Sequence, residues 1–155
     1  QRALRLVRSR AAEWNVNPAA VGILGFSAGG EVALLAATRG ADGQPDAADP
    51  IDRQSARANF YSLIYPGGLP RTDIVVTKET PPTFLVAGYG DRQNISEGLA
   101  EFYLKSKRAG ASAELHMYAG AGHGFGVRDT NKSPAGAWLA RFHEWLADRK
   151  FLKTP

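Results

Sequence analysis

Apolar residues along this chain follow two periodicities, one typical of helices and one typical of buried strands. Over residues 2–14, apolar side chains recur at near-helical spacing among arginines, which predicts an amphipathic helix. Residues 20–26 form a short and almost continuous apolar run after a turn, a pattern typical of a buried parallel strand. Residues 27–38 then predict a second helix, which a glycine ends.

The rest of the chain repeats this alternation. Three more strands are predicted at residues 59–65, 83–88 and 113–118, and two more helices at residues 95–109 and 134–149. Because strands alternate with helices, we expect an α/β fold, with a mostly parallel sheet of about four strands and helices on both faces. No repeat or clear boundary interrupts residues 1–155, so we expect one domain.

The net charge of +4 raises the question of a nucleic-acid partner. Arg2, Arg5 and Arg8 step by three along the first predicted helix and therefore lie close to one face. We interpret this face as solvated, with a phosphate-binding stripe as the alternative. No zinc-finger or aromatic-rich RNA motif accompanies it, so no nucleic-acid partner is expected.

The motifs give little support to cofactors or to a membrane. The absence of cysteine excludes a disulfide, a thiolate metal site and a cysteine nucleophile. Neither H-E-x-x-H nor a nucleotide-binding glycine loop occurs, so we expect no metal and no other cofactor. No apolar run approaches the roughly 20 residues that span a bilayer, and no signal peptide is visible. We expect a soluble protein without a membrane partner, and its compartment stays open.

One motif points to nucleophilic chemistry. Gly25-Phe26-Ser27-Ala28-Gly29 fits G-x-S-x-G and lies where a predicted strand meets a predicted helix, the context of a nucleophile elbow. We predict Ser27 as the nucleophile, because glycines two residues away on either side leave room for a tight turn. The N–H of Ala28 is predicted to donate to the oxyanion. The alternative is a glycine-rich turn with a capping serine.

A serine nucleophile needs a base, and the chain has three histidines. His116 falls inside a predicted strand and His143 inside the last predicted helix, so both are interpreted as structural. His123 lies in a glycine-rich loop directly after the predicted strand 113–118. Because sites of open parallel sheets gather at the carboxyl ends of strands, His123 is the predicted base.

The third member should also follow a strand and lie between serine and histidine in the chain. Asp91 meets both conditions, and its predicted role is to orient His123 and stabilise the imidazolium. A surface or helix-capping aspartate is the alternative interpretation, and Asp73 and Asp129 are weaker rivals. The resulting order Ser, Asp, His is that of α/β-hydrolases.

Several segments together resemble one family over nearly the whole chain. They are the arginine-rich first helix, the elbow, Leu63-Ile64-Tyr65-Pro66-Gly67, Thr80-Pro81-Pro82-Thr83-Phe84 and Gly122-His123-Gly124-Phe125-Gly126. With them the chain resembles acetylxylan-esterase-like and feruloyl-esterase-like serine esterases of the α/β-hydrolase superfamily.

The resemblance implies that Ser27, Asp91 and His123 match the catalytic positions of the family. It also implies hydrolysis of short acyl esters, notably acetyl groups on plant cell-wall sugars. Two positions depart from the pattern. Many relatives carry an aspartate where this chain has Gly90, and relatives often carry a histidine where it has Glu31.

The front of the chain departs further. This chain begins at the helix before the elbow strand, so we expect a truncated α/β-hydrolase that lacks the upstream strands and the loop with the second oxyanion donor. Residues 20–26 would then form a sheet edge, and long apolar edges recruit partners. A short esterase that self-associates through this edge is favoured over a fragment of a longer enzyme and over a poorly active remnant.

The expected function is therefore a serine esterase with a small-molecule ester substrate. The predicted substrate walls are Phe26, Tyr65 and Phe125, although each could equally be core packing. The alternatives are a peptidase of the prolyl-oligopeptidase type, and a degenerate hydrolase that serves as a binding or assembly module.

Overall fold

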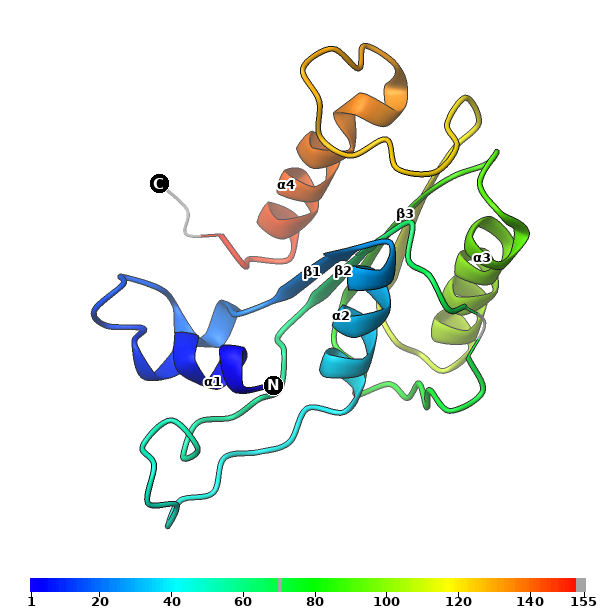
Figure 1. The fold of residues 1–155 in the computed structure, drawn as a ribbon. Coiled ribbons are helices and arrows are strands. Elements are labelled where there is room, and N and C mark those ends of the chain that lie inside the picture. Colours follow the sequence, from blue (N-terminus) through cyan, green and yellow to red (C-terminus); the bar gives the residue numbers. More distant parts are fainter. Residues whose placement is uncertain (70, 153–155) are drawn as a thin grey trace.

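The computed structural model describes residues 1–69 and 71–152 as strands that alternate with helices (Figure 1). The helices and strands are, in chain order, α1 (Arg2–Ser9), β1 (Ile23–Phe26), α2 (Ala28–Thr38), β2 (Tyr61–Ile64), β3 (Thr83–Gly88), α3 (Gln93–Arg108), β4 (Ala113–Tyr118) and α4 (Trp138–Asp148). Short 3-10 turns precede β1 and α4, at Pro18–Ala20 and Pro134–Ala137.

The four strands form one parallel sheet in the order β1-β2-β3-β4. The register aligns Phe26 with Ile64, Ile64 with Val86 and Val86 with His116. The carboxyl ends of all four strands therefore lie at the same end of the sheet. The outermost strand on one side of this sheet is β1. The predicted α/β class and the mostly parallel sheet are confirmed.

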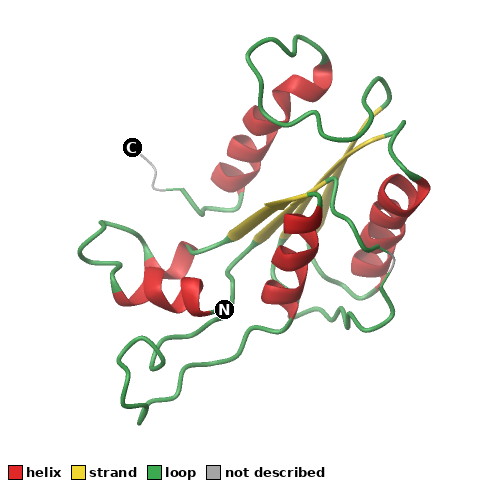
Figure 2. Ribbon diagram, viewed as in Figure 1, coloured by secondary structure: helices red, strands yellow, loops and turns green. Residues whose placement is uncertain are grey.

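Helices cover both faces of the sheet (Figure 2). Alternate strand residues point to opposite faces, so neighbours such as Leu63 and Ile64 belong to different cores. One core joins Leu63 and its neighbours to α2 and α3, and the other joins Ile64 to Trp138 and Trp145 of α4. Because both faces are covered, β2 and β3 are buried along their whole lengths.

The element boundaries differ most from expectation at the front of the chain. The first helix ends at Ser9 rather than at residue 14, and the first strand begins at Ile23 rather than at residue 20. The reason is local, since the Asn17 side chain accepts from the Ala19 N–H at 3.0 Å and caps a 3-10 turn there.

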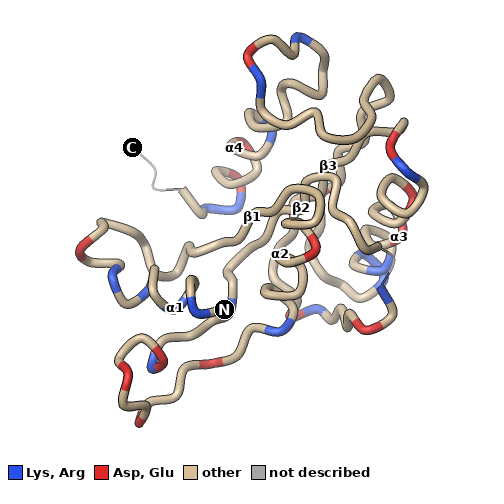
Figure 3. The backbone as a smooth tube through the Cα atoms, in the orientation of Figure 1, with Lys and Arg blue, Asp and Glu red and all other residues tan. Residues whose placement is uncertain are grey.

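The arginine stripe of α1 is only partly solvated, since the Arg2 side chain is 61% exposed and that of Arg5 is 14% exposed. The Arg2 and Arg5 guanidinium groups bind Asp52, each at 3.2 Å. Arg8 makes four hydrogen bonds, to the carbonyls of residues 18, 55 and 57 and to the Asn59 side chain, at 2.6–3.2 Å. Figure 3 shows acidic and basic residues interleaved here. The stripe therefore ties α1 to the long loop before β2.

Within residues 1–69 and 71–152, no helix combines the length and apolar character needed to cross a bilayer.

Candidate active site

Ser27 lies at the sharp turn that joins β1 to α2. Its backbone is left-handed, with φ 50° and ψ −122°, an uncommon conformation for a residue with a side chain. Its N–H donates to the carbonyl of Ile64 at 3.0 Å. Its own carbonyl accepts from the N–H groups of Gly30, at 2.9 Å, and Gly67, at 3.0 Å. Hydrogen bonds to two other segments therefore hold the strained turn in place.

The positions at the elbow where a side chain would clash are not the two that the motif suggests. A Cβ on Gly25 would lie 2.1 Å from the carbonyl oxygen of Gly29, so only glycine fits there. A Cβ on Gly29 would meet no heavy atom within 4 Å, so the expected crowding at this position is wrong. The second crowded position is instead Gly30, where a Cβ would lie 2.8 Å from Pro66.

Ser27, His123 and Asp91 form a continuous hydrogen-bonded chain. Ser27 Oγ lies 2.9 Å from His123 Nε2, and His123 Nδ1 lies 2.8 Å from Asp91 Oδ2. The Asp91 side chain is fully buried, whereas the side chain of His123 is 33% exposed. The contact with the carboxylate assigns the proton to Nδ1, which leaves Nε2 to accept from the serine hydroxyl. The three residues predicted from the sequence are thus brought together.

Each of the three side chains follows the carboxyl end of a strand. Ser27 follows β1, Asp91 follows β3 and His123 follows β4, so all three lie where the carboxyl ends of the parallel strands gather. The other oxygen of Asp91 accepts from the N–H of Arg92 at 2.7 Å, at the start of α3. This bond holds the second carboxylate oxygen in place but does not cap α3, whose N-cap residue is Arg92.

The rival residues lie in other contacts. Asp73 binds the guanidinium groups of Arg71 and Arg39. His116 lies 2.8 Å from Glu114 on β4, and His143 is exposed on α4. The contact with Glu114 fits the structural interpretation of His116, and His143 lies on the exposed side of α4, away from the sheet end that carries Ser27.

An aromatic clamp holds the loop that carries His123. The Tyr65 hydroxyl accepts from the Gly126 N–H at 3.1 Å, and the Trp138 indole donates to the Gly126 carbonyl at 2.9 Å. The Tyr65 ring also packs edge-on against His123, with 5.0 Å between ring centroids. Sequence reasoning missed this clamp, because nothing in the local sequence pairs Trp138 with a loop twelve residues earlier.

Two of the predicted substrate walls are buried. Tyr65 is 5% exposed and Phe125 is 9% exposed, so both mainly support the His123 loop. Burial raises the pKa of the Tyr65 phenol, so the hydroxyl stays neutral around pH 7. Phe26 is 39% exposed and packs on Tyr65 and Trp138, which leaves part of its ring open beside the elbow. Burial therefore favours the alternative of core packing for Tyr65 and Phe125.

The N-terminus of α2 offers one oxyanion donor. Ala28 is the first residue of the helix, so its N–H has no partner within the helix. Ala28 is an exposed residue and directly follows Ser27. The helix terminus adds a partial positive charge at this point.

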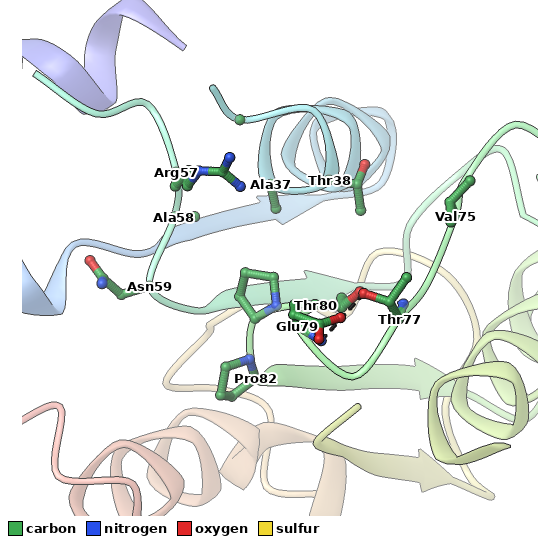
Figure 4. Close-up of a pocket in the computed structure, with 12 residues that line it drawn as sticks. Ala37, Thr38, Arg57, Ala58, Asn59, Val75, Thr77, Glu79, Thr80 and Pro82 are labelled. Atoms are coloured by element: carbon green, nitrogen blue, oxygen red, sulfur yellow. Dashed lines mark hydrogen bonds between the residues drawn. The ribbon is translucent and has the colours of Figure 1, made fainter. Parts of the chain in front are cut away.

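A separate hollow lies at the opposite end of the strands, where their amino ends gather (Figure 4). It encloses about 580 Å³ beside the amino ends of β2 and β3, with Arg57 and Pro82 in its lining. Its polar groups are used within the protein, since Arg57 binds Asp42 at 2.7 Å and the Thr77 and Thr80 hydroxyls accept from backbone N–H groups. It is therefore distinct from the edge that carries Ser27.

Across residues 1–69 and 71–152, no three His, Asp or Glu side chains gather in a way that could hold a metal ion.

Comparison with known proteins gives consistent matches. The family model of the dienelactone hydrolase family matches residues 1–152. An acetylxylan esterase of Xylanibacter ruminicola is 25% identical over 177 residues, which cover 94% of this chain and 32% of that protein.

Solved structures of esterases share the fold. The acetyl ester-xyloside bifunctional hydrolase from Caldicellulosiruptor lactoaceticus is 28% identical with a TM-score of 0.86, over 97% of this chain and 64% of that chain. A thermophilic esterase from Thermogutta terrifontis, with propionate bound, is 25% identical with a TM-score of 0.80, over 99% of this chain and 64% of that chain. The chain thus spans about a third of the curated relative and less than two thirds of these solved chains.

Proposed function

The chain belongs to the dienelactone hydrolase family, and on that premise we propose that it hydrolyses short-chain carboxylic esters through an acyl-enzyme on Ser27. The observation that carries the proposal is the unbroken contact from Ser27 Oγ through His123 to the buried Asp91, at 2.9 and 2.8 Å. A serine hydroxyl is activated when it is hydrogen-bonded to a histidine that a carboxylate orients.

The reaction proceeds in two acyl transfers. His123 Nε2 takes the proton of Ser27 as Oγ attacks the ester carbonyl, and Asp91 stabilises the imidazolium that forms. His123 then returns the proton to the leaving alcohol. Water, activated by the same histidine, attacks the acyl-enzyme and releases the acid.

The oxyanion of each tetrahedral intermediate is stabilised at the N-terminus of α2. The N–H of Ala28 supplies one donor, and the helix dipole adds to the potential there. One such donor typically contributes about 10²–10³ in rate.

Acetyl esters of plant cell-wall sugars are the proposed substrates. The similar proteins named as an acetylxylan esterase and as an acetyl ester-xyloside hydrolase support this class. The exposed part of Phe26, next to the elbow, would contact the acyl or sugar group.

Turnover of p-nitrophenyl acetate tests the proposal. Ser27→Ala and His123→Ala should each lower kcat by about 10⁴ or more. His143→Ala is the matched control, because His143 is exposed on α4, and it should keep the wild-type rate. Equal rates for wild type and Ser27→Ala would refute the esterase, and faster cleavage of a proline p-nitroanilide would favour a peptidase.

We further infer that two copies associate through β1. The N–H groups of Ile23 and Ser27 point to β2, so the backbone groups of Leu24 and Phe26 face the open edge. These two residues are also 37% and 39% exposed, and within residues 1–69 and 71–152 no strand pairs with this side of β1. A two-fold axis would pair β1 antiparallel with its copy.

Sedimentation velocity at low micromolar concentration tests this pairing. Wild type should sediment as a dimer and Leu24→Lys as a monomer. Val75→Lys is the control, since Val75 is 74% exposed and lies away from β1, and it should remain dimeric. A wild-type monomer would remove the inference.

A further inference from the structure

An acidic side chain lies one helical turn beyond the proposed nucleophile. Glu31 is in the first turn of α2, and its N–H points to the carbonyl of Ser27 at 3.4 Å. A carboxylate in a first turn favours the helix, because it complements the helix dipole. The same negative charge, unless neutralised, opposes the oxyanion that forms beside Ala28.

Arg71 neutralises this carboxylate. Its guanidinium binds the Glu31 carboxylate with one nitrogen and the Asp73 carboxylate with two others, at 2.9 and 3.0 Å. Arg39, at the other end of α2, binds Asp73 at 2.6 Å. The charges of Glu31, Arg71, Asp73 and Arg39 therefore alternate in sign beside α2 and sum to zero.

The loop after β2 closes over the same carboxylate. Gly68 has φ 70°, and a Cβ there would lie 2.7 Å from the Glu31 carboxyl carbon, so the loop backbone rests directly on that group. The Glu31 side chain is 34% exposed and that of Arg71 is 25% exposed. Because both side chains are partly buried, water screens the Glu31 charge from the oxyanion less effectively than Arg71 does.

We propose that Arg71 is a positioning residue for ester hydrolysis, because its neutralisation of Glu31 keeps the N-terminus of α2 favourable to the oxyanion. The inference rests on the proposed function of Ser27. Two unit charges about 8 Å apart, at an effective dielectric constant of about 20–40, change a rate by roughly fivefold to thirtyfold. An unpaired Glu31 should therefore slow the reaction by about tenfold.

Four variants separate this charge effect from a loss of structure. Arg71→Gln should lower kcat on p-nitrophenyl acetate by about tenfold with little change in KM, and 0.5 M salt should restore part of the rate. Glu31→Gln should stay near the wild-type rate, and Arg71→Gln/Glu31→Gln should return to the rate of Glu31→Gln. Asp73→Asn is the control, because it leaves the Arg71 contact with Glu31 in place. A double variant as slow as Arg71→Gln would overturn the inference.

A conservative variant gives a second readout. Arg71→Lys keeps a cation beside Glu31, so it should recover most of the rate that Arg71→Gln loses, whereas a role that depends only on the guanidinium contacts with Asp73 would slow both variants alike. Asp91, the carboxylate in contact with His123, is the same in every variant. Absence of turnover above Ser27→Ala would refute the proposed function alone, and equal rates of Arg71→Lys and Arg71→Gln would refute the role of Arg71.

Discussion

Removal of one hydroxyl, in Tyr65→Phe, should loosen the loop that holds His123. The substitution keeps the ring, which packs edge-on against His123, and deletes the acceptor for the Gly126 N–H. Gly126 is half-buried, so its N–H loses an acceptor that water only partly replaces. The free energy of unfolding should fall by about 1–2 kcal/mol, or about 2–6 °C in melting temperature.

The effect on rate follows from the same hydrogen bond. The Trp138 indole still holds the Gly126 carbonyl, so the loop pivots rather than detaches. The alignment of His123 can lose at most the free energy of the missing hydrogen bond, about 1–2 kcal/mol. The value of kcat should therefore fall by up to about fivefold to thirtyfold, with KM unchanged. The imidazole remains present, so the loss should be far smaller than in His123→Ala.

The assay is p-nitrophenyl acetate turnover together with thermal unfolding followed by circular dichroism. Tyr89→Phe is the control, since Tyr89 is near Asp91 in sequence but 73% exposed. Wild-type kcat and melting temperature in Tyr65→Phe would refute the reasoning, as would an equal loss of rate in Tyr89→Phe.

Three other predictions concern stability. Arg8→Met should lower the free energy of unfolding in urea by about 1–3 kcal/mol, because the part-buried carbonyl of Ser55 and the Asn59 side chain lose a charged donor, and an unchanged midpoint would contradict this. Gly25→Ala should prevent folding while Gly29→Ala is tolerated, and equal soluble yields with native circular dichroism would show that the crowding at position 25 is relieved in some other way. Arginine partners hold the pKa values of Asp42 and Asp49 below 3.8, the ordinary value. Their contribution is therefore present above about pH 4 and is lost as pH falls below it, so urea midpoints should drop between pH 5 and pH 3 and Asp49→Asn should reduce the drop.

The candidate triad could be predicted because each member has a local signal. The elbow motif, an aspartate after one strand and a histidine after another all lie next to apolar runs. Those runs, bounded by turn residues, predicted β3 and β4 residue for residue. Because parallel strands bring their carboxyl ends to the same end of the sheet, the placement of the three residues could be predicted, whereas their hydrogen bonds could not.

The supporting contacts could not be predicted, because they join residues that no local pattern relates. Arg8 reaches carbonyls nearly fifty residues away, and Arg71 reaches Glu31 across forty residues. Periodicity assigned the arginines of α1 to a face but gave no information on what covers that face. A side chain such as Tyr65 reads equally as a substrate wall or as packing until its burial is known.

The left-handed backbones of Ser27 and Tyr65 set a different balance at each position. With φ values of 50° and 38°, each holds a conformation that costs on the order of 1–3 kcal/mol for a residue with a side chain. At Tyr65 the buried ring and the hydrogen bond with Gly126 outweigh that strain, because loss of a buried aromatic ring typically costs about 3–5 kcal/mol. Ser27 is only partly buried, so glycine there should release strain, and Ser27→Gly should unfold at no lower urea concentration than wild type. Stability therefore explains a tyrosine at position 65 and leaves the serine at position 27 to be explained by its hydroxyl.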